Sequence, residues 1–406
     1  MKEQVIEMLT NNDNNKYLKN IPLFSRYRFW INMMIIGPIL IPFMLFKGLN
    51  YTQILLLQSI SALAVFIFEV PTGSIADKIS RKFSLVLGSV SLIIGLALYI
   101  FFQSFYIFAL AEIIFGLGLT FNSGADSAIL YESLSLTGKK EEYQNAEGHS
   151  SSLVFIGQAV GSIFSSILYT KNEYLPFLIS LVFMSFSIFY AIRFIEPKRT
   201  KSEHNYLSHV FKSFEICFKT PRLLWLLCFA VFMGFALRIS FWLYQPYFEL
   251  AKIDIFWYGM IFCFFNLVAA FASKYIGAKF YERRPRHILL VLALLITVSF
   301  LIPIVYVSPF MIVILALQQI VRGMYSTTSR FYINHQVEDS KRATIISVIS
   351  LAGSIGFAVL SPLTGKLLDI KGAKTSYFCV GLFCLISLLL LFILRKSQKS
   401  KKKNRF

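Results

Sequence analysis

Residues 68–82 read FEVPTGSIADKISRK, a short charged segment between two long apolar runs. The first run begins near Thr52, and the second begins at Phe83 with no room for a soluble domain between them. An apolar run of about 20 residues is long enough to cross a bilayer as a helix. We therefore interpret this segment as the tight, charged hairpin that joins two membrane helices.

The composition supports a membrane protein. Of the 406 residues, 56% are hydrophobic and only 15% are charged, and a soluble chain of this length could not bury so much apolar surface in its cores. The formal net charge of +19 comes from cations confined to short segments between apolar runs. That pattern is typical of membrane topology rather than of a nucleic-acid surface, so no nucleic-acid partner is expected.

The length rule predicts an all-α membrane protein with twelve transmembrane helices, because only helices satisfy the backbone in so many closely spaced segments. The predicted spans cover residues 27–46, 52–76, 83–102, 105–130, 150–170, 175–195, 222–248, 255–280, 287–306, 309–333, 343–368 and 374–395.

A long polar connection divides the predicted spans into two halves. Residues 1–26 form a leader, 27–195 and 222–395 form two six-helix bundles, 196–221 form the central loop, and 396–406 form a basic tail. Lys and Arg concentrate in alternate connections. By the positive-inside rule, we expect a multi-pass protein of the cell membrane with both termini in the cytoplasm.

The charged segment resembles a motif of the major facilitator superfamily, Gly-x-x-x-Asp-Arg/Lys-x-Gly-Arg/Lys-Arg/Lys. The matching residues are Gly73, Asp77, Lys78, Arg81 and Lys82, while Ser80 stands where Gly is usual. Residues 277–286 are a degraded second copy, with Tyr281 in the place of Asp77. The resemblance implies two pseudo-symmetric six-helix bundles, alternating access and a substrate site near the midplane between them.

Three ionisable residues lie well inside predicted spans: Glu112, Arg238 and Arg322. Such residues are costly in a bilayer, so each is a candidate for binding substrate or protons. The resemblance places spans four, seven and ten along a central cavity. The alternative is that Glu112 pairs with an arginine and only holds the two halves together.

A charge cluster is expected where the charged segment meets the cytoplasmic end of span four. Its predicted members are Glu69, Gly73, Asp77, Arg81, Lys82, Asp126 and Glu132. Glu69, Gly73 and Asp77 share one helix face, and Arg81 is the expected cation between Asp77 and Asp126. The resemblance implies that this cluster is a conformational latch. The alternative is ordinary solvation at the membrane interface.

Four glycines are candidates for close helix packing or gating: Gly157, Gly161, Gly353 and Gly356. Their spacing allows another helix to approach closely. The related antiporter patterns are incomplete, because Glu112 stands where those proteins carry Arg, and Ser162 stands where they carry Pro.

These observations favour a secondary transporter, with proton-coupled efflux of amphiphilic compounds as the first hypothesis. The resemblance is to drug-efflux-like bacterial members, and aromatic residues such as Trp242, Tyr244 and Tyr247 on expected cavity helices favour a lipophilic substrate. A carrier of an anionic or zwitterionic metabolite is the alternative, because two arginines are more than a cation exporter needs. A non-transporting membrane sensor is a remote alternative.

No enzyme is expected. The chain lacks a phosphate-binding Gly-x-x-x-x-Gly-Lys-Ser/Thr motif, and its His and Cys residues have no metal-ligand spacing. We expect no cofactor, no metal and no catalytic residue. The expected partners are a small-molecule substrate, protons and membrane lipids, and the expected state is a monomer.

Overall fold

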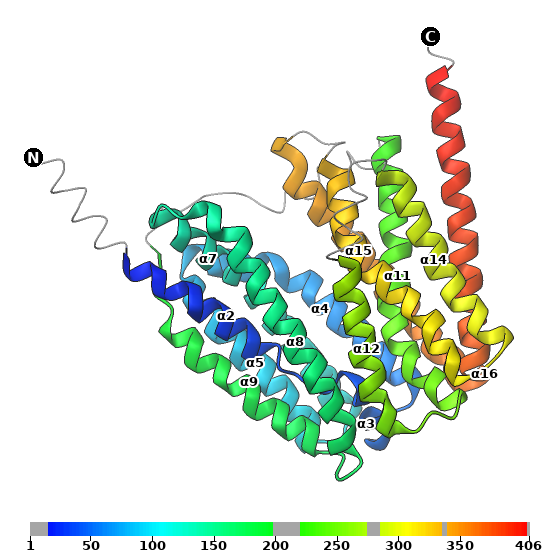
Figure 1. Cartoon of the computed structure of the whole chain (residues 1–406), viewed down its shortest axis with the longest axis horizontal. Coiled ribbons are helices and arrows are strands. Elements are labelled where there is room, and N and C mark those ends of the chain that lie inside the picture. The colour runs from blue at the N-terminus through cyan, green and yellow to red at the C-terminus, as the bar shows by residue number, and fades with distance from the viewer. Residues whose placement is uncertain (1–14, 198–219, 274–284, 335–338, 404–406) are drawn as a thin grey trace, which may run out of the picture. The chain divides into compact units, whose positions relative to one another are not determined.

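The computed structural model describes residues 15–197, 220–273, 285–334 and 339–403 (Figure 1). Regular secondary structure in these ranges is entirely helical. The α-helices are α2 (Asn20–Ile31), α3 (Leu40–Phe46), α4 (Tyr51–Lys78), α5 (Arg81–Phe101), α6 (Phe105–Asn122), α7 (Ala125–Leu136), α8 (Tyr143–Tyr169), α9 (Leu175–Arg193), α11 (Pro221–Leu250), α12 (Tyr258–Phe271), α14 (Pro285–Val305), α15 (Ile312–Asn334) and α16 (Asp339–Lys403).

The helices account for the predicted spans. In the described ranges, eight helical segments are long and apolar enough to cross a membrane, and three shorter apolar helices accompany them. The last long segment, Val348–Leu394, contains two helices, because α16 is interrupted at Gly372, whose φ of +74° is not helical. Counting this last segment as two helices, the long and the shorter apolar helices together match the twelve expected spans. The predicted fold class is therefore confirmed.

The first span is not the continuous helix that the sequence predicted for residues 27–46. Helix α2 ends at Ile31 and α3 begins at Leu40. Gly37-Pro38 lies within the break and favours an interruption there, since proline lacks an N–H and disfavours helical geometry in the residue before it. The side-chain amide of Asn32 donates to the carbonyl of Arg28 at 2.8 Å and so caps the last turn of α2.

The fourth span, predicted as residues 105–130, is also interrupted. Helix α6 ends at Asn122 and α7 begins at Ala125. Between them Gly124 has a φ of +75°, a left-handed conformation that glycine adopts at little cost. The break places Asp126 in the first turn of α7, where the helix dipole stabilises a negative charge.

Contacts divide the chain into two units. The first comprises residues 1–37 and 64–204, and the second comprises residues 38–63 and 205–406. Helix α4 therefore has its N-terminal part in the second unit. The predicted bundle boundaries, 27–195 and 222–395, stay a prediction.

A stripe of small and polar residues on α16 explains why the start of α4 packs within the second unit. The stripe consists of Ser361, Gly365 and Asp369, which lie on one helix face. Ser361 hydrogen-bonds Ser59 at 2.8 Å, and Gly365 lies against the backbone of Tyr51. The Asp369 carboxylate accepts from the backbone N–H groups of Tyr51 and Thr52 at 2.9 and 2.8 Å and so satisfies two free donors of the α4 N-terminus.

Two glycine contacts fix how helices of the second unit cross. A Cβ atom on Gly234 of α11 would lie 2.5 Å from the Cα atom of Gly353 in α16. A Cβ atom on Gly323 of α15 would lie 2.4 Å from the carbonyl oxygen of Ala269 in α12. Both neighbours are backbone atoms that cannot rotate away, so only glycine permits these crossings.

We predict that Gly234→Ala destabilises the protein by about 1–3 kcal/mol, the usual effect of overpacking a tight contact. Gly148→Ala is the matched control, because Gly148 lies within α8 and a Cβ atom there would meet no atom within 4 Å. Thermal unfolding of the purified protein in detergent measures both variants. Equal melting temperatures would contradict the tight crossing.

Candidate functional site

Arg322 on α15 is held by neutral side chains. Its Nη1 atom donates to the Gln319 Oε1 atom at 3.0 Å, and its Nη2 atom donates to the Asn266 Oδ1 atom of α12 at 3.2 Å. Gln319 in turn donates from Nε2 to the Tyr244 hydroxyl of α11 at 2.8 Å. The contact between Gly323 and Ala269 brings α15 close enough to α12 for Arg322 to reach Asn266.

Arg238 on α11 is held in a similar way. Its Nη2 atom donates to the Ser354 hydroxyl of α16 at 3.1 Å, and its guanidinium carbon lies 5.7 Å from the centroid of the Phe357 ring. The crossing at Gly234 and Gly353 lies one helical turn before Arg238 and brings Ser354 within reach. Two hydrogen-bonded arginines thus sit beside the two tight helix crossings of the second unit.

Both arginines retain an exposed surface. Val313, which is 66% exposed, precedes Arg322 by nine residues and therefore lies about 180° around the helix. If the apolar Val313 faces lipid, Arg322 faces away from it. Among the described residues no carboxylate forms an ion pair with Arg238 or Arg322.

Glu112 lies in the first unit. It is buried, with 6% of its surface exposed, and its Oε1 atom accepts a hydrogen bond of 2.6 Å from the Tyr99 hydroxyl of α5. The Tyr99 ring stacks on Phe108 with centroids 4.8 Å apart. These contacts are local to α5 and α6. The proposed role of Glu112 in binding protons or substrate stays a prediction.

The charge cluster of the first unit contains one of the two expected partners of Arg81, Asp77, but not the other. The Arg81 Nη1 atom lies 2.6 Å from the Glu132 Oε1 atom, and its Nη2 atom lies 3.5 Å from the Asp77 Oδ1 atom. Glu69 accepts from the Ser123 hydroxyl at 3.1 Å. The expected pairing of Arg81 with Asp126 is therefore wrong, and Glu132 takes that place.

Asp126 belongs to a second group of charges. The Arg28 Nε atom of α2 lies 3.8 Å from the Asp126 Oδ2 atom, and the same guanidinium also pairs with Glu147 of α8. The break at Gly124 starts a new helix at Ala125, where Asp126 pairs with Arg28. The predicted latch function of Gly73, Asp77, Arg81, Lys82, Asp126 and Glu69 stays a prediction.

Sequence reasoning missed Glu196, which follows α9. Its carboxylate accepts from the Ser80 hydroxyl and from the backbone N–H groups of Arg81 and Lys82 at 2.8, 3.0 and 2.9 Å. It therefore caps the N-terminus of α5, where a negative charge is favourable. The 115 residues between Arg81 and Glu196 hide this contact in the sequence, although an acid directly after a span is a visible signal.

The predicted packing glycines lie against neighbouring elements. Cβ atoms on Gly157 and Gly161 would lie 2.8 Å from the Phe29 ring and 2.3 Å from the Ile35 side chain, and one on Gly356 would lie 2.8 Å from Val231. Gly353 is the partner of Gly234 described above. Packing remains our interpretation of these residues.

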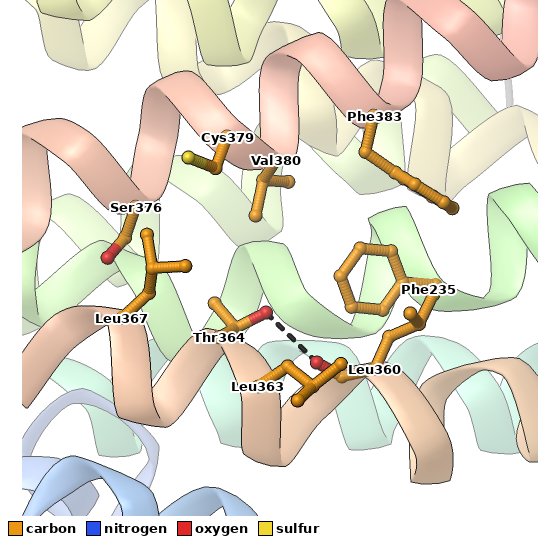
Figure 2. Close-up of a pocket in the computed structure, with 9 residues that line it drawn as sticks. All are labelled: Phe235, Leu360, Leu363, Thr364, Leu367, Ser376, Cys379, Val380 and Phe383. Atoms are coloured by element: carbon orange, nitrogen blue, oxygen red, sulfur yellow. Dashed lines mark hydrogen bonds between the residues drawn. The ribbon is translucent and has the colours of Figure 1, made fainter.

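An apolar pocket of about 120 Å³ lies between α11 and the two segments of α16. Figure 2 shows the residues that line it. Phe235, Leu363, Cys379 and Phe383 are among its lining residues. The Thr364 hydroxyl already donates to the carbonyl of Leu360 at 3.1 Å (Figure 2). This lining suits an apolar group rather than an anion.

No group of three or more His, Cys, Asp and Glu residues that could hold a metal ion occurs in the part of the chain that the structure describes.

The long apolar helices are those of a multi-pass membrane protein. Ionisable residues inside such helices commonly mark the path of a substrate or an ion, which favours a carrier.

Comparisons with known proteins agree on the family. A model of the Major Facilitator Superfamily matches residues 29–308 and 257–406. The uncharacterized MFS-type transporter YxaM of Bacillus subtilis is 25% identical over 383 residues, which cover 91% of this chain and 94% of YxaM. The sucrose permease of Escherichia coli is 22% identical over 379 residues, with 87% of each chain covered.

A solved structure of the nucleoside transporter NupG has a TM-score of 0.75 at 13% identity and covers 94% of this chain and 99% of NupG. A bacterial homolog of the lysosomal transporter Spinster has a TM-score of 0.72 at 17% identity, with 94% and 97% covered. These two likenesses concern the fold. By the match to the family model, the chain belongs to the Major Facilitator Superfamily and is a transporter of that family.

We predict that a double-mutant cycle of Arg81→Gln and Glu132→Gln gives a coupling free energy of about 1–2 kcal/mol, because the two charges lie 2.6 Å apart and are mostly buried. The matched cycle of Arg81→Gln with Asp126→Asn should give less than about 0.5 kcal/mol. Unfolding in mixed micelles measures both cycles. A larger coupling to Asp126 would support the original sequence prediction instead.

Proposed function

We propose that the chain is a secondary transporter that carries a small anionic or zwitterionic organic molecule by alternating access. The observation that carries this proposal is the pair Arg238 and Arg322, whose recorded hydrogen bonds go to neutral oxygens only. Arg238 and Arg322 are the proposed substrate-binding residues of the second unit.

A charge without a counter-charge inside a membrane protein is energetically costly, so such a residue usually has a functional role. Carboxylate and phosphate groups match the planar fork of a guanidinium, and a bound anion supplies the missing counter-charge. The hydrogen bonds to Asn266, Gln319 and Ser354 hold both guanidinium groups in place before the substrate arrives, which lowers the entropy cost of binding.

Efflux of amphiphilic compounds is the second candidate function. The apolar pocket of Figure 2 favours it, but its 120 Å³ is below the roughly 300 Å³ of the smallest usual ligand pockets. Three of the aromatic residues that suggested a lipophilic substrate, Trp242, Tyr244 and Tyr247, are buried in the second unit and are 7%, 2% and 0% exposed. We therefore rank this function below anion transport.

Proton coupling remains part of the proposal, with Glu112 as the proton-binding candidate. A buried carboxyl beside a tyrosine hydroxyl can take up a proton without leaving a charge in the membrane. We also retain the sequence-based predictions of a monomer in the cell membrane with both termini in the cytoplasm.

We predict that the purified protein binds members of a panel of small carboxylates and phosphates, such as benzoate, succinate and glycerol phosphate. Arg238→Gln and Arg322→Gln should each lower the affinity about 10- to 100-fold, because each removes a hydrogen bond to a charged group worth about 1.5–3 kcal/mol. Isothermal titration calorimetry, with sucrose and ethidium as neutral and cationic comparisons, measures the affinities.

Arg193→Gln serves as the control, because it removes an arginine that lies over the Phe189 ring in the first unit. This variant should leave anion affinity unchanged. Binding of ethidium but of no anion, or full anion affinity in both arginine variants, would contradict the proposal.

A further inference from the structure

We propose that Asn266 and Gln319 are positioning residues that keep Arg322 selective for anions because their side chains are amides and not acids. This inference rests on the proposed function and deepens it. It assigns the charge selectivity of the Arg322 site to two residues that the sequence did not single out.

The two amide oxygens occupy the places where carboxylates would neutralise the arginine. Gln319 Oε1 and Asn266 Oδ1 lie 3.0 and 3.2 Å from two different nitrogens of the guanidinium. Asp and Glu have nearly the same shapes as Asn and Gln, so an acid at either position would form an ion pair with Arg322 at these distances. The amides orient the guanidinium without cancelling its charge.

The orientation of the Gln319 amide is itself fixed. Its Nε2 atom donates to the Tyr244 hydroxyl at 2.8 Å, which turns Oε1 toward Arg322. Gln319 is 3% exposed and Tyr244 is 2% exposed, so packing also restricts both side chains. The chain from Tyr244 through Gln319 to Arg322 and Asn266 links α11, α15 and α12.

Arginines of the first unit provide the contrast. Arg28 pairs with Asp126 and Glu147, and Arg81 pairs with Glu132 and Asp77. This chain thus places acids around Arg28 and Arg81 and amides around Arg322. An arginine that is paired with carboxylates is already neutralised and stabilises the fold. An arginine that is held only by amides keeps its charge and can bind an incoming anion.

Cys263 provides a native reporter of local charge. It lies on α12 about one helical turn before Asn266 and is partly exposed. In a chain whose other cysteines are Ser, its rates with an anionic and a cationic methanethiosulfonate reagent are compared with those of a free small thiol. The normalised ratio of the two rates reports the electrostatic potential beside Arg322.

We expect the chain with native Asn266 and Gln319 to favour the anionic reagent. Asn266→Asp and Gln319→Glu should each lower the anion-to-cation rate ratio on the order of tenfold, because each introduces a negative charge near Cys263. Asn172→Asp is the matched control, since it makes the same chemical change in an exposed turn and should leave the ratio unchanged. An unchanged ratio in both acid variants overturns the inference.

Stability gives an independent readout that also applies if Cys263 is unreactive. Asn266→Asp should raise the melting temperature above that of Asn266→Ala, because the acid gives Arg322 a counter-charge whereas alanine removes a hydrogen bond. The same comparison applies to Gln319→Glu and Gln319→Ala. Acid variants that melt below their alanine counterparts, or that do not fold, overturn the inference.

The two proposals fail in different ways. If Arg322→Gln abolishes anion binding but the acid variants bind the anion as tightly as the native chain, the role of Asn266 and Gln319 fails and anion transport stands. If the acid variants lose the anion preference at Cys263 but no anion of the panel binds the native chain, the proposed function fails and the amide role stands.

Discussion

A charged side chain in a membrane-spanning helix needs a counter-charge, hydrogen bonds or water, and the units of this protein meet that need in two ways. In the first unit Arg28 and Arg81 pair with carboxylates. In the second unit Arg238 and Arg322 donate to a hydroxyl and to two amides. The first arrangement neutralises charge and ties helices together. The second leaves positive charge on side chains that are partly exposed, and anion transport is the function that we propose for it.

Helix packing determines where the available charges lie. Gly234 against Gly353 and Gly323 against Ala269 bring backbones closer than any side chain would allow. Arg238 lies one turn beyond the first contact and Arg322 lies next to the second, so short polar side chains on the partner helices can reach both. The same glycines that allow tight packing in lipid, where small residues favour helix association, thus position the candidate binding groups.

Much of the fold could be predicted from the sequence because it depends on local patterns. Apolar runs of sufficient length and the charged segment at residues 68–82 predict the spans and the family resemblance. Partners distant in sequence could not be predicted. Arg81 and Asp77 are one turn apart and were expected to meet, whereas Glu196 reaches Arg81 across 115 residues. Because the helix is interrupted at Gly124, Asp126 pairs with Arg28 and not with Arg81 as the sequence had suggested. Asn266 was missed because a single amide in an apolar run has no characteristic spacing, and Gln319 was missed although it follows Gln318 and precedes Arg322 by three residues.

The central claim is that Arg238 and Arg322 hold positive charge that attracts anions, and halide binding tests it most directly. Bromide is a small anion with no other recognition requirement, and its anomalous scattering locates it in crystals soaked in sodium bromide. The account predicts anomalous peaks within hydrogen-bonding distance of the Arg322 and Arg238 guanidinium groups, and loss of each peak when its arginine is replaced by Gln. Peaks confined to the charge cluster of the first unit, or no peak at either arginine, would contradict it.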